Sequence, residues 1–470
     1  MNSLRILPVV DKRIVTGILN MALKPCKVII AGAGLAGLTL ALTLERIGVD
    51  YVLLEAYSDI VTRAGAGICL LPNALRILDQ LGCYEDLVSR VKQGVENINI
   101  RKSDGESMKP SSGWWKFHIQ RYGYGFHWCD RTTVLEVLYE NVKDKSKVIP
   151  NKRVETVQYA ADSVSVTTID GSIYSGDILI GTDGIHSRVR KEMNRYAENF
   201  GLGEIYTEQE SKVPATYACM FGLSTSVPGI PEACLDFGVE KGFSYVLGSG
   251  PENRTYWFLF VNLGRALTGS EIPRLTESDI DRVVQEHWDD RITPDVRLAD
   301  LYKHKRNVVF SPMREFVYKQ WHLNRSIVLG DAAHQMTSNI AQGGAQAIES
   351  AAELANNLIS ALSNSTNNDP LSIEEVENMF ERFQAVRHPR VQAMMELSHK
   401  RQLMDAMETP EMEDLVLNKL PKMLPDILVQ RWDETFLPAA SLRMLPIPKR
   451  PKISPFHDEI SQDLNLASKF

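Results

Sequence analysis

Residues Lys27–Glu55 read KVIIAGAGLAGLTLALTLERIGVDYVLLE, and the rest of the chain is organised around this stretch. Three glycines, Gly32, Gly34 and Gly37, follow an apolar run, and a helix-like segment and a second apolar run come after them. Gly32 permits a tight strand-to-helix turn, Gly34 lets a pyrophosphate approach the backbone, and Gly37 lets the helix pack close to the strand. This order of elements predicts a strand–turn–helix–strand unit.

Both ends of this unit suit an adenine dinucleotide. The helix after the glycines directs its free N–H groups and its positive end toward a pyrophosphate. Glu55 stands at the end of the second apolar run, where its carboxylate can accept hydrogen bonds from both ribose hydroxyls. The stretch therefore predicts a dinucleotide site, and it leaves open whether the ligand is FAD or NAD(P).

The composition of the chain excludes several classes of protein. Its 470 residues allow two or three domains, and a hydrophobic content of 44% is ample for a core. The formal net charge is −7 without any basic block, so nucleic acid is not an expected partner. Six scattered cysteines without a C-x-x-C pair favour reduced thiols, and no metal site is predicted. The two long uncharged runs contain glycines or prolines, so no membrane span is predicted.

Two later apolar strands also end in glycine turns that carry a carboxylate. One reaches Gly181-Thr182-Asp183-Gly184, and the other reaches Gly330-Asp331-Ala332-Ala333-His334. Ligands of doubly wound sheets bind at the carboxyl ends of the strands, so three such ends suit one long cofactor. No second G-x-G-x-x-G follows a strand, and a nicotinamide reductant is therefore expected to bind transiently or in a shared cleft.

Several other segments carry expectations of their own. Residues 103–125 are rich in aromatic side chains and favour a surface loop or a lid over an apolar pocket. Residues 215–264 alternate as strands, which predicts an antiparallel sheet. Residues 374–404 are predicted to be helical, with a break at Pro389. Residues 441–470 resemble a tail.

Three motifs together resemble those of the single-component (group A) FAD-dependent monooxygenases, the aromatic-hydroxylase class. Their order and spacing match over roughly residues 25–400. The motifs are GAGLAGL at Gly32–Leu38, GTDGIHSRVR at Gly181–Arg190 and GDAAH at Gly330–His334. Within this class the chain is most similar to the fungal epoxidases of the paxilline and meroterpenoid pathways. That similarity is carried by Asn73–Tyr84, Asp130-Arg131 and Tyr217-Ala218-Cys219.

The resemblance implies an α/β fold with a divided organisation. A Rossmann-type FAD-binding domain would be interleaved with an antiparallel-sheet substrate domain, and C-terminal helices would follow. The expected parts are an N-terminal extension at 1–24, the FAD-binding domain at 25–95, 126–200 and 305–362, the substrate-binding domain at 96–125 and 201–304, and a helical C-terminal region and tail at 363–470.

The resemblance also implies FAD as the cofactor, NADPH as the co-substrate and O2 as the oxidant. Glu55 would take the adenosine ribose, Arg131 would contact the cofactor, and Asp331 would hold its ribityl or pyrophosphate region. The backbone at Cys69 and Gly344 would lie against the flavin. Asp183 would organise the cleft that FAD and NADPH share.

Arg190 and Tyr217 match positions that are treated as catalytic in this class. Each also has an ordinary structural reading, Arg190 as a helix-start ion pair and Tyr217 as a packed strand residue, and Arg188 is a neighbouring candidate. The oxidant of the class is a flavin C4a-hydroperoxide, so the protein's tasks are to orient the acceptor, exclude water and supply a proton. The histidines are isolated, and His334 is interpreted as structural.

Two departures from the class pattern concern the flavin ring. Ser338 stands where the class commonly has a proline, and Ala341-Gln342-Gly343-Gly344-Ala345 replaces its G-Q-G-A-N. Both changes bear on how the ring is held. They leave open whether the product is a simple epoxide or one that is steered into a rearrangement.

The sequence thus predicts an enzyme that epoxidises or hydroxylates an apolar terpenoid, meroterpenoid or prenylated indole alkaloid scaffold. The alternatives are a hydroxylase of a small phenol, as in relatives of salicylate hydroxylase, and a non-oxygenating flavin oxidoreductase. The expected location is cytoplasmic, with peripheral association with an internal membrane left open. The expected state is a monomer or a weak dimer.

Overall fold

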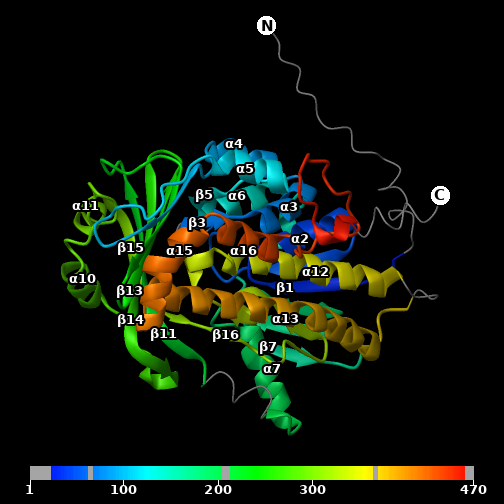
Figure 1. The fold of residues 1–470 in the computed structure, drawn as a ribbon. Helices are drawn as coiled ribbons and strands as arrows, with labels where there is room; N and C mark the ends of the chain where they lie inside the picture. Colours follow the sequence, from blue (N-terminus) through cyan, green and yellow to red (C-terminus); the bar gives the residue numbers. More distant parts are fainter. Residues whose placement is uncertain (1–22, 62–66, 204–211, 364–368, 461–470) are drawn as a thin grey trace.

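The computed structural model of the protein describes residues 23–61, 67–203, 212–363 and 369–460. Figure 1 shows two units side by side, a parallel sheet covered by helices and a second sheet that carries its own small helices. The long helices α12 (Gly343–Ser363) and α13 (Ile373–Asp405) pack against each other along the first unit. At its far end α13 contacts the second sheet and so joins the two units.

The first sheet is built around the strand that precedes Gly32. Across the sheet the strands are β17 (His322–Leu323), β18 (Ser326–Val328), β10 (Ile178–Gly181), β1 (Lys27–Ala31), β2 (Asp50–Leu54) and β6 (Val148–Ile149). Only the β17–β18 pair is antiparallel. Because β1, β10 and β18 are parallel neighbours, their carboxyl ends meet at one edge of the sheet. This arrangement confirms the prediction that the three glycine turns converge.

The second sheet is the antiparallel sheet predicted from the alternating segment. Its strands, in order, are β15 (Lys305–Arg314), β11 (Pro214–Thr225), β14 (Arg254–Thr268), β13 (Phe243–Gly250), β12 (Cys234–Glu240) and β4 (Asn97–Arg101), the last of which pairs in parallel with β12. Successive side chains of β11 point to opposite faces. Tyr217 and Cys219 join the main core, whereas Ala218 and Met220 join a smaller core. The helices α10 (Glu277–Glu286) and α11 (Leu298–Lys303) contribute to this smaller core.

The remaining elements complete the two units. Smaller sheets pair β3 (Gly67–Leu70) with β5 (His127–Asp130), β16 (Phe316–Val317) with β19 (His334–Gln335), and β7 (Val154–Tyr159) with β8 (Val164–Thr168) and β9 (Ile173–Gly176). The other longer helices are α2 (Leu35–Ile47), α3 (Pro72–Gln80), α4 (Tyr84–Val91), α5 (Trp114–Tyr122), α6 (Arg131–Asn141), α7 (Arg188–Asn199) and α16 (Asp426–Phe436). Two short helices, α14 (Pro410–Asp414) and α15 (Leu420–Met423), precede α16.

The predicted break at Pro389 is wrong, because α13 continues through this residue. A proline inside a helix removes one backbone hydrogen bond and crowds the preceding turn. Two arginines flank Pro389 and tie this part of the helix to α12: Arg387 and Arg390 both donate to Glu349. We attribute the continuity of α13 to these tertiary contacts.

The predicted tail is also wrong for the described residues 441–460. Leu442 and Phe456 are fully buried, and the segment packs along α3. Arg76 of α3 pairs with Asp458 at 2.9 Å and lies over the Phe456 ring, with its guanidinium carbon 3.9 Å from the ring centroid. The segment is therefore held by an apolar anchor and by side chains that lie far away in the sequence. Residues 461–470 lie outside the described residues.

The aromatic segment 103–125 contains α5 and lies outside the lining of the cavity described below. Trp114 stacks on His118, and the His118 ring lies 3.7 Å from that of Phe126, centroid to centroid. Trp432 of α16 meets Trp114 edge to face. These contacts make a packed aromatic cluster, so the lid interpretation is not supported. Among the described residues, no helix combines the length and the apolar character that crossing a bilayer requires.

Candidate active site

A cavity of about 360 Å³ lies between the carboxyl edge of the parallel sheet and the antiparallel sheet. Residues that are distant in the sequence converge on it. Its walls include Gly34, Thr182, Gly184 and Asp331 from the three turns, and Ile68, Cys69, Trp128 and Arg131 from β3, β5 and α6. Ser338 from the segment before α12, Gly343 and Gly344 from the first turn of α12, and Phe221, Phe258 and Met313 from the antiparallel sheet complete them. One cavity thus joins the predicted cofactor turns to the predicted substrate sheet.

The first turn has no room for side chains at two of its glycines. Gly32 has a φ of +104°, and a Cβ atom there would lie 2.6 Å from the Thr182 carbonyl oxygen. A Cβ atom on Gly37 would lie 2.0 Å from the carbonyl oxygen of Gly32. At Gly34, in contrast, the nearest atom would be 3.8 Å away, on Arg131. Gly34 therefore leaves open space in the cavity at the amino end of α2, where a phosphate group could approach.

Glu55 closes this turn from the end of β2. Its carboxylate accepts a hydrogen bond from the Ala33 N–H at 2.7 Å and another from the Tyr57 N–H at 3.0 Å. A carboxylate has about four acceptor positions, so two remain for ribose hydroxyls. The side chain is buried, in keeping with a role inside the turn.

Arg131 and Asp331 place opposite charges on the same cavity. Arg131 is the first residue of α6, and Asp331 lies in the turn after β18. Asp331 is exposed to the open cavity, but the protein atoms around its carboxyl raise the pKa through desolvation, an effect that Arg131 opposes. Desolvation also disfavours the charged form of Arg131 and so lowers its pKa, whereas the negative charges of Asp331 and Glu55 oppose that shift. A guanidinium suits phosphate oxygens and a carboxylate suits hydroxyl groups, so the pair fits a polar, phosphate-bearing chain.

Cys69 and Gly344 line the part of the cavity between β3 and α12. A Cβ atom on Gly344 would lie 2.8 Å from Ile68 and 3.0 Å from Leu35. A larger residue at this position would therefore crowd these two side chains. Burial raises the pKa of the Cys69 thiol, which keeps it neutral. Ser338, the position of the missing proline, lines the same cavity.

Asp183 and Arg190 are absent from the lining that the described residues provide. The Asp183 carboxylate accepts hydrogen bonds from the Arg188 and Val189 N–H groups at 2.6 and 3.1 Å, so it caps the start of α7. Arg190 is buried, and it donates to the carbonyl oxygens of Ala332 at 2.8 Å and Ile185 at 2.9 Å. Both side chains thereby hold the turns that do line the cavity.

Tyr217 lies on the same face of β11 as the cavity residue Phe221, four residues earlier in the strand, but it does not line the cavity itself. It is 1% exposed, and its hydroxyl donates to the Glu408 carboxylate, which also accepts from Asn262 at 2.6 Å. Burial, and then the contact with Glu408, raises the pKa of Tyr217, so the phenol stays protonated. Its cross-strand partner in β15 is Met313, which does line the cavity.

The residues that sequence reasoning missed are those of the apolar wall. Phe221 and Phe258 are cross-strand partners with ring centroids 5.3 Å apart, and Trp128 lies 5.9 Å from Phe258. The alternation of β11 and β14 indicated two faces. Nothing in it indicated which face would meet the cavity, because that depends on how the two units pack.

Comparisons with known proteins agree with this geometry. The matching family model, described as an FAD binding domain, covers residues 25–398. The chain is 34% identical to the FAD-dependent monooxygenase ausM of Penicillium brasilianum over 429 residues, which is 90% of this chain and 88% of that protein. It is 37% identical to the FAD-dependent monooxygenase prhF of the same organism over 364 residues, 77% of this chain and 76% of that protein.

The chain belongs to the FAD-dependent monooxygenases. Klebsiella pneumoniae HpxO, in a structure complexed with FAD and uric acid, has a similar fold, with a TM-score of 0.69 at 21% identity. That similarity covers 90% of this chain and 98% of the other. The predicted family, fold class and FAD dependence are thereby confirmed.

The residues of this monooxygenase fit FAD on their own geometry. The open position at Gly34 and the N-terminus of α2 suit the pyrophosphate, and Arg131 adds a cation there. Glu55 retains free acceptor positions for the ribose, and Asp331 offers a carboxylate to the ribityl hydroxyls. Gly344 and the Cys69 backbone would flank the ring. These residue roles stay predictions.

Proposed function

We propose that this monooxygenase uses NADPH and O2 to epoxidise or hydroxylate an apolar secondary-metabolite scaffold, such as a terpenoid, a meroterpenoid or a prenylated indole alkaloid. The balanced reaction is acceptor plus O2, NADPH and H⁺ to oxygenated acceptor, water and NADP⁺. FAD supplies the redox and oxygen-activating chemistry when it is bound. The remaining tasks belong to the protein.

The observation that carries this proposal is the apolar wall opposite the cofactor turns. Phe221, Phe258, Met313 and Trp128 meet the cavity there. Among the described lining residues, the charged side chains are Arg131 and Asp331, both on the cofactor side. A wall of this kind binds an apolar acceptor and excludes water, and it provides no ion-pair partner for an anionic phenol. It therefore favours the apolar scaffold over a small phenolic acid.

Tyr217 and Arg190 support this site without lining the cavity themselves. Tyr217 holds β11 beside Met313 through its contact with Glu408. Arg190 holds the carbonyl of Ala332, next to Asp331. Their contacts favour positioning roles, and the direct catalytic roles predicted for them stay predictions. The same applies to Asp183 and the cleft shared with NADPH.

A substrate panel tests the proposal. Purified, FAD-loaded protein would be given NADPH in air with polyprenylated indoles, terpenoid alkenes and small phenols, and the products would be identified by mass spectrometry. We expect substrate-stimulated NADPH oxidation and an oxygenated product with an apolar scaffold. Oxygenation of small phenols alone would favour the hydroxylase alternative, and peroxide as the sole product with every acceptor would favour a non-oxygenating oxidoreductase.

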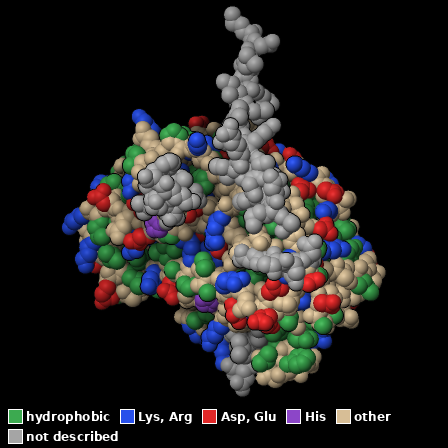
Figure 2. All heavy atoms as spheres, turned by 90° about the vertical axis from the view of Figure 1, so that its right-hand side faces the viewer, with side chains coloured by type: hydrophobic (Ala, Val, Ile, Leu, Met, Phe, Trp, Pro, Cys, Tyr) green, Lys and Arg blue, Asp and Glu red, His purple; other side chains and the backbone are tan. Residues whose placement is uncertain are grey.

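We further propose a cytoplasmic protein, monomeric or weakly dimeric, that associates at most peripherally with an internal membrane. On the face that Figure 2 shows, acidic and basic side chains are interspersed and the hydrophobic ones occur in small groups. Mixed charge of this kind supports solubility more than strong adsorption to an anionic surface. Retention of the full-length chain in membrane pellets after a high-salt wash would contradict this proposal.

A further inference from the structure

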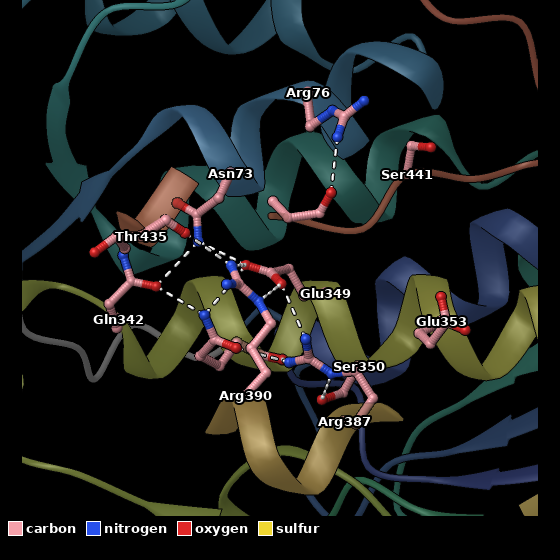
Figure 3. Close-up of polar contacts among 12 residues, drawn as sticks. Asn73, Arg76, Gln342, Glu349, Ser350, Glu353, Arg387, Arg390, Thr435 and Ser441 are labelled. Atoms are coloured by element: carbon pink, nitrogen blue, oxygen red, sulfur yellow. Dashed lines mark hydrogen bonds and ion pairs between the residues drawn. The ribbon is translucent and has the colours of Figure 1, made fainter. Parts of the chain in front are cut away.

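A buried cluster of charged side chains lies behind the turn at residues 341–344. Glu349 of α12 accepts hydrogen bonds from Arg387 at 2.9 Å and from Arg390 at 2.7 and 2.8 Å. The side chains of Glu349 and Arg387 are 0% and 1% exposed. Figure 3 shows Glu349 between Asn73 on one side and the two arginines of α13 on the other. Each of these buried charges needs its partner, because a buried charge without an ion-pair partner strongly destabilises the folded protein.

The cluster is connected to the turn by amide side chains. Asn73 Nδ2 donates to Glu349 Oε1 at 2.7 Å and to Gln342 Oε1 at 3.0 Å. Gln346 Nε2 donates to the same two oxygens, at 3.1 and 2.9 Å. The two amide groups that donate to Gln342 Oε1, those of Asn73 and Gln346, therefore also donate to Glu349. Gln342 immediately precedes Gly343 and Gly344, which line the cavity.

The arginines attach α13 to the first turns of α12. Arg387 Nη2 donates to the Gln346 side chain at 2.7 Å and to its carbonyl oxygen at 3.2 Å. Arg390 donates in addition to the Thr435 carbonyl of α16 at 2.9 Å. The start of α12 is therefore held from three helices at once: α3 through Asn73, α13 through the arginines, and α16 through Arg390.

The cluster also carries a net charge. One carboxylate faces two guanidinium groups, so the three side chains together are positive. Burial acts to raise the pKa of Glu349, but Arg390 and Arg387 outweigh it and hold the pKa below its ordinary value. This positive group lies near the amino end of α12, whose helix dipole has the same sign.

We propose that the Glu349–Arg387–Arg390 cluster, acting through Asn73 and Gln342, positions the turn at 341–344 for FAD and thereby sets FAD affinity and the electronic environment of the bound flavin. These are positioning residues, since none of them lines the cavity. The inference rests on FAD use by the family. It needs neither NADPH nor the proposed substrate class, so its failure and theirs are distinguishable.

A matched pair of variants isolates the link to the turn. Asn73→Ala removes the side chain that joins Glu349 to Gln342. Asn356→Ala removes another buried asparagine, on α12, which donates to Glu353 at 3.1 Å and to the Ser441 carbonyl at 2.8 Å. Both variants remove two hydrogen bonds that a buried side-chain amide donates, so comparable losses of thermal stability are expected.

FAD titration and the visible spectrum of the bound flavin separate the two variants. We expect Asn73→Ala to weaken FAD binding about ten-fold or more and to shift the visible absorption bands. Asn356→Ala should keep the Kd for FAD within about two-fold of the wild-type value and keep the spectrum. Equal FAD affinity and equal spectra in both variants would overturn the proposal.

A second variant guards against a general loss of folding in Asn73→Ala. Gln342→Met keeps the length of the side chain and leaves the ion pairs of Glu349 untouched, but it removes the oxygen that Asn73 and Gln346 share. It should reproduce the weaker FAD binding and the spectral shift while the FAD-free protein melts near the wild-type temperature. Wild-type FAD affinity and spectrum in Gln342→Met would contradict the proposed link.

Discussion

Glu55, at the end of β2, accepts a 2.7 Å hydrogen bond from the backbone N–H of Ala33, in the glycine turn that follows β1. The residue predicted to take the adenosine ribose therefore also fixes the turn that faces the pyrophosphate. On this prediction, one side chain contacts both the glycine turn and the adenosine ribose. Its removal should affect FAD binding more than it affects folding.

Glu55→Gln should weaken FAD binding by about ten-fold or more. Glutamine keeps one acceptor oxygen, but its amide NH2 cannot accept from a backbone N–H or from a ribose hydroxyl, and a charged hydrogen bond is worth about 1.5–3 kcal/mol. Glu45→Gln is the matched control, because Glu45 also accepts from two backbone N–H groups, those of Lys143 and Asp144, away from the cavity. The measurement is the Kd for FAD, and equal values in both variants would contradict the role of Glu55.

Gly34→Ala and Gly37→Ala should fail in different ways. A Cβ atom on Gly34 meets no atom closer than 3.8 Å, so the FAD-free protein should melt near the wild-type temperature but lose FAD affinity. A Cβ atom on Gly37 would lie 2.0 Å from a backbone oxygen, so this variant should lose about 1–3 kcal/mol of stability or more without any ligand. Melting of the FAD-free proteins and FAD titration check both statements. Normal FAD binding by Gly34→Ala would show that the pyrophosphate lies elsewhere.

These glycines could be predicted because their requirement is local. The tight turn and the close helix–strand contact need residues without a Cβ atom, and the spacing of Gly32, Gly34 and Gly37 records that need in the sequence itself. The same holds for the carboxylates that follow the later strands. The convergence of the three turns followed from the parallel sheet and required no knowledge of side-chain packing.

Other features could not be predicted, because long-range contacts decide them. Pro389 indicates a helix break, but α13 continues through it, and we attribute this to the long-range hydrogen bonds from Arg387 and Arg390 to Glu349. Residues 441–460 look like a tail until Phe456 is seen buried beside Arg76. The apolar wall of the cavity likewise depends on how the two sheets face each other. The domain boundaries expected from the sequence stay a prediction.

Tyr217→Phe should keep FAD bound and lower the yield of oxygenated product by about five- to ten-fold. The variant removes the hydroxyl that donates to Glu408, so β11 loses a side-chain hydrogen bond at the residue that pairs with Met313. Tyr245→Phe is the matched control in the same sheet, because the Tyr245 hydroxyl donates to Asp290 at 2.8 Å but its ring belongs to the smaller core. Product formation per NADPH consumed is the measurement. Equal product yields in the two variants would remove Tyr217 from the site.

The pair His399–Glu315 should make part of the stability depend on pH. His399 Nδ1 lies 2.8 Å from the Glu315 carboxylate, and this bond raises the pKa of His399 above its ordinary value. The ion pair therefore contributes its full stabilisation of the folded state below the pKa of His399 in the unfolded chain, about 6.5. This stabilisation is lost as pH rises through the higher pKa that His399 has in the folded protein. Glu315 also accepts from Thr337 at 2.6 Å, next to the cavity residue Ser338.

The difference in melting temperature between wild type and His399→Gln should accordingly be largest at acidic pH and shrink as pH rises above neutrality. His304→Gln is the control, because the His304 ring bonds the backbone carbonyl of Asp300 rather than a carboxylate. Its difference from wild type should not follow this trend. A gap for His399→Gln that grows with pH would contradict a stabilising ion pair between His399 and Glu315.

We propose that this FAD-dependent monooxygenase transfers one atom of O2 to an apolar acceptor held against the wall formed by Phe221 and Phe258. The most direct measurement is a reaction of the FAD-loaded protein with NADPH and oxygen-18 gas, using the best acceptor of the substrate panel, followed by mass spectrometry of the product. We predict a product that carries one oxygen-18 atom, with the label lost when unlabelled O2 and labelled water are used instead. Incorporation of oxygen from water, or recovery of all consumed O2 as hydrogen peroxide, would contradict the proposed oxygen transfer.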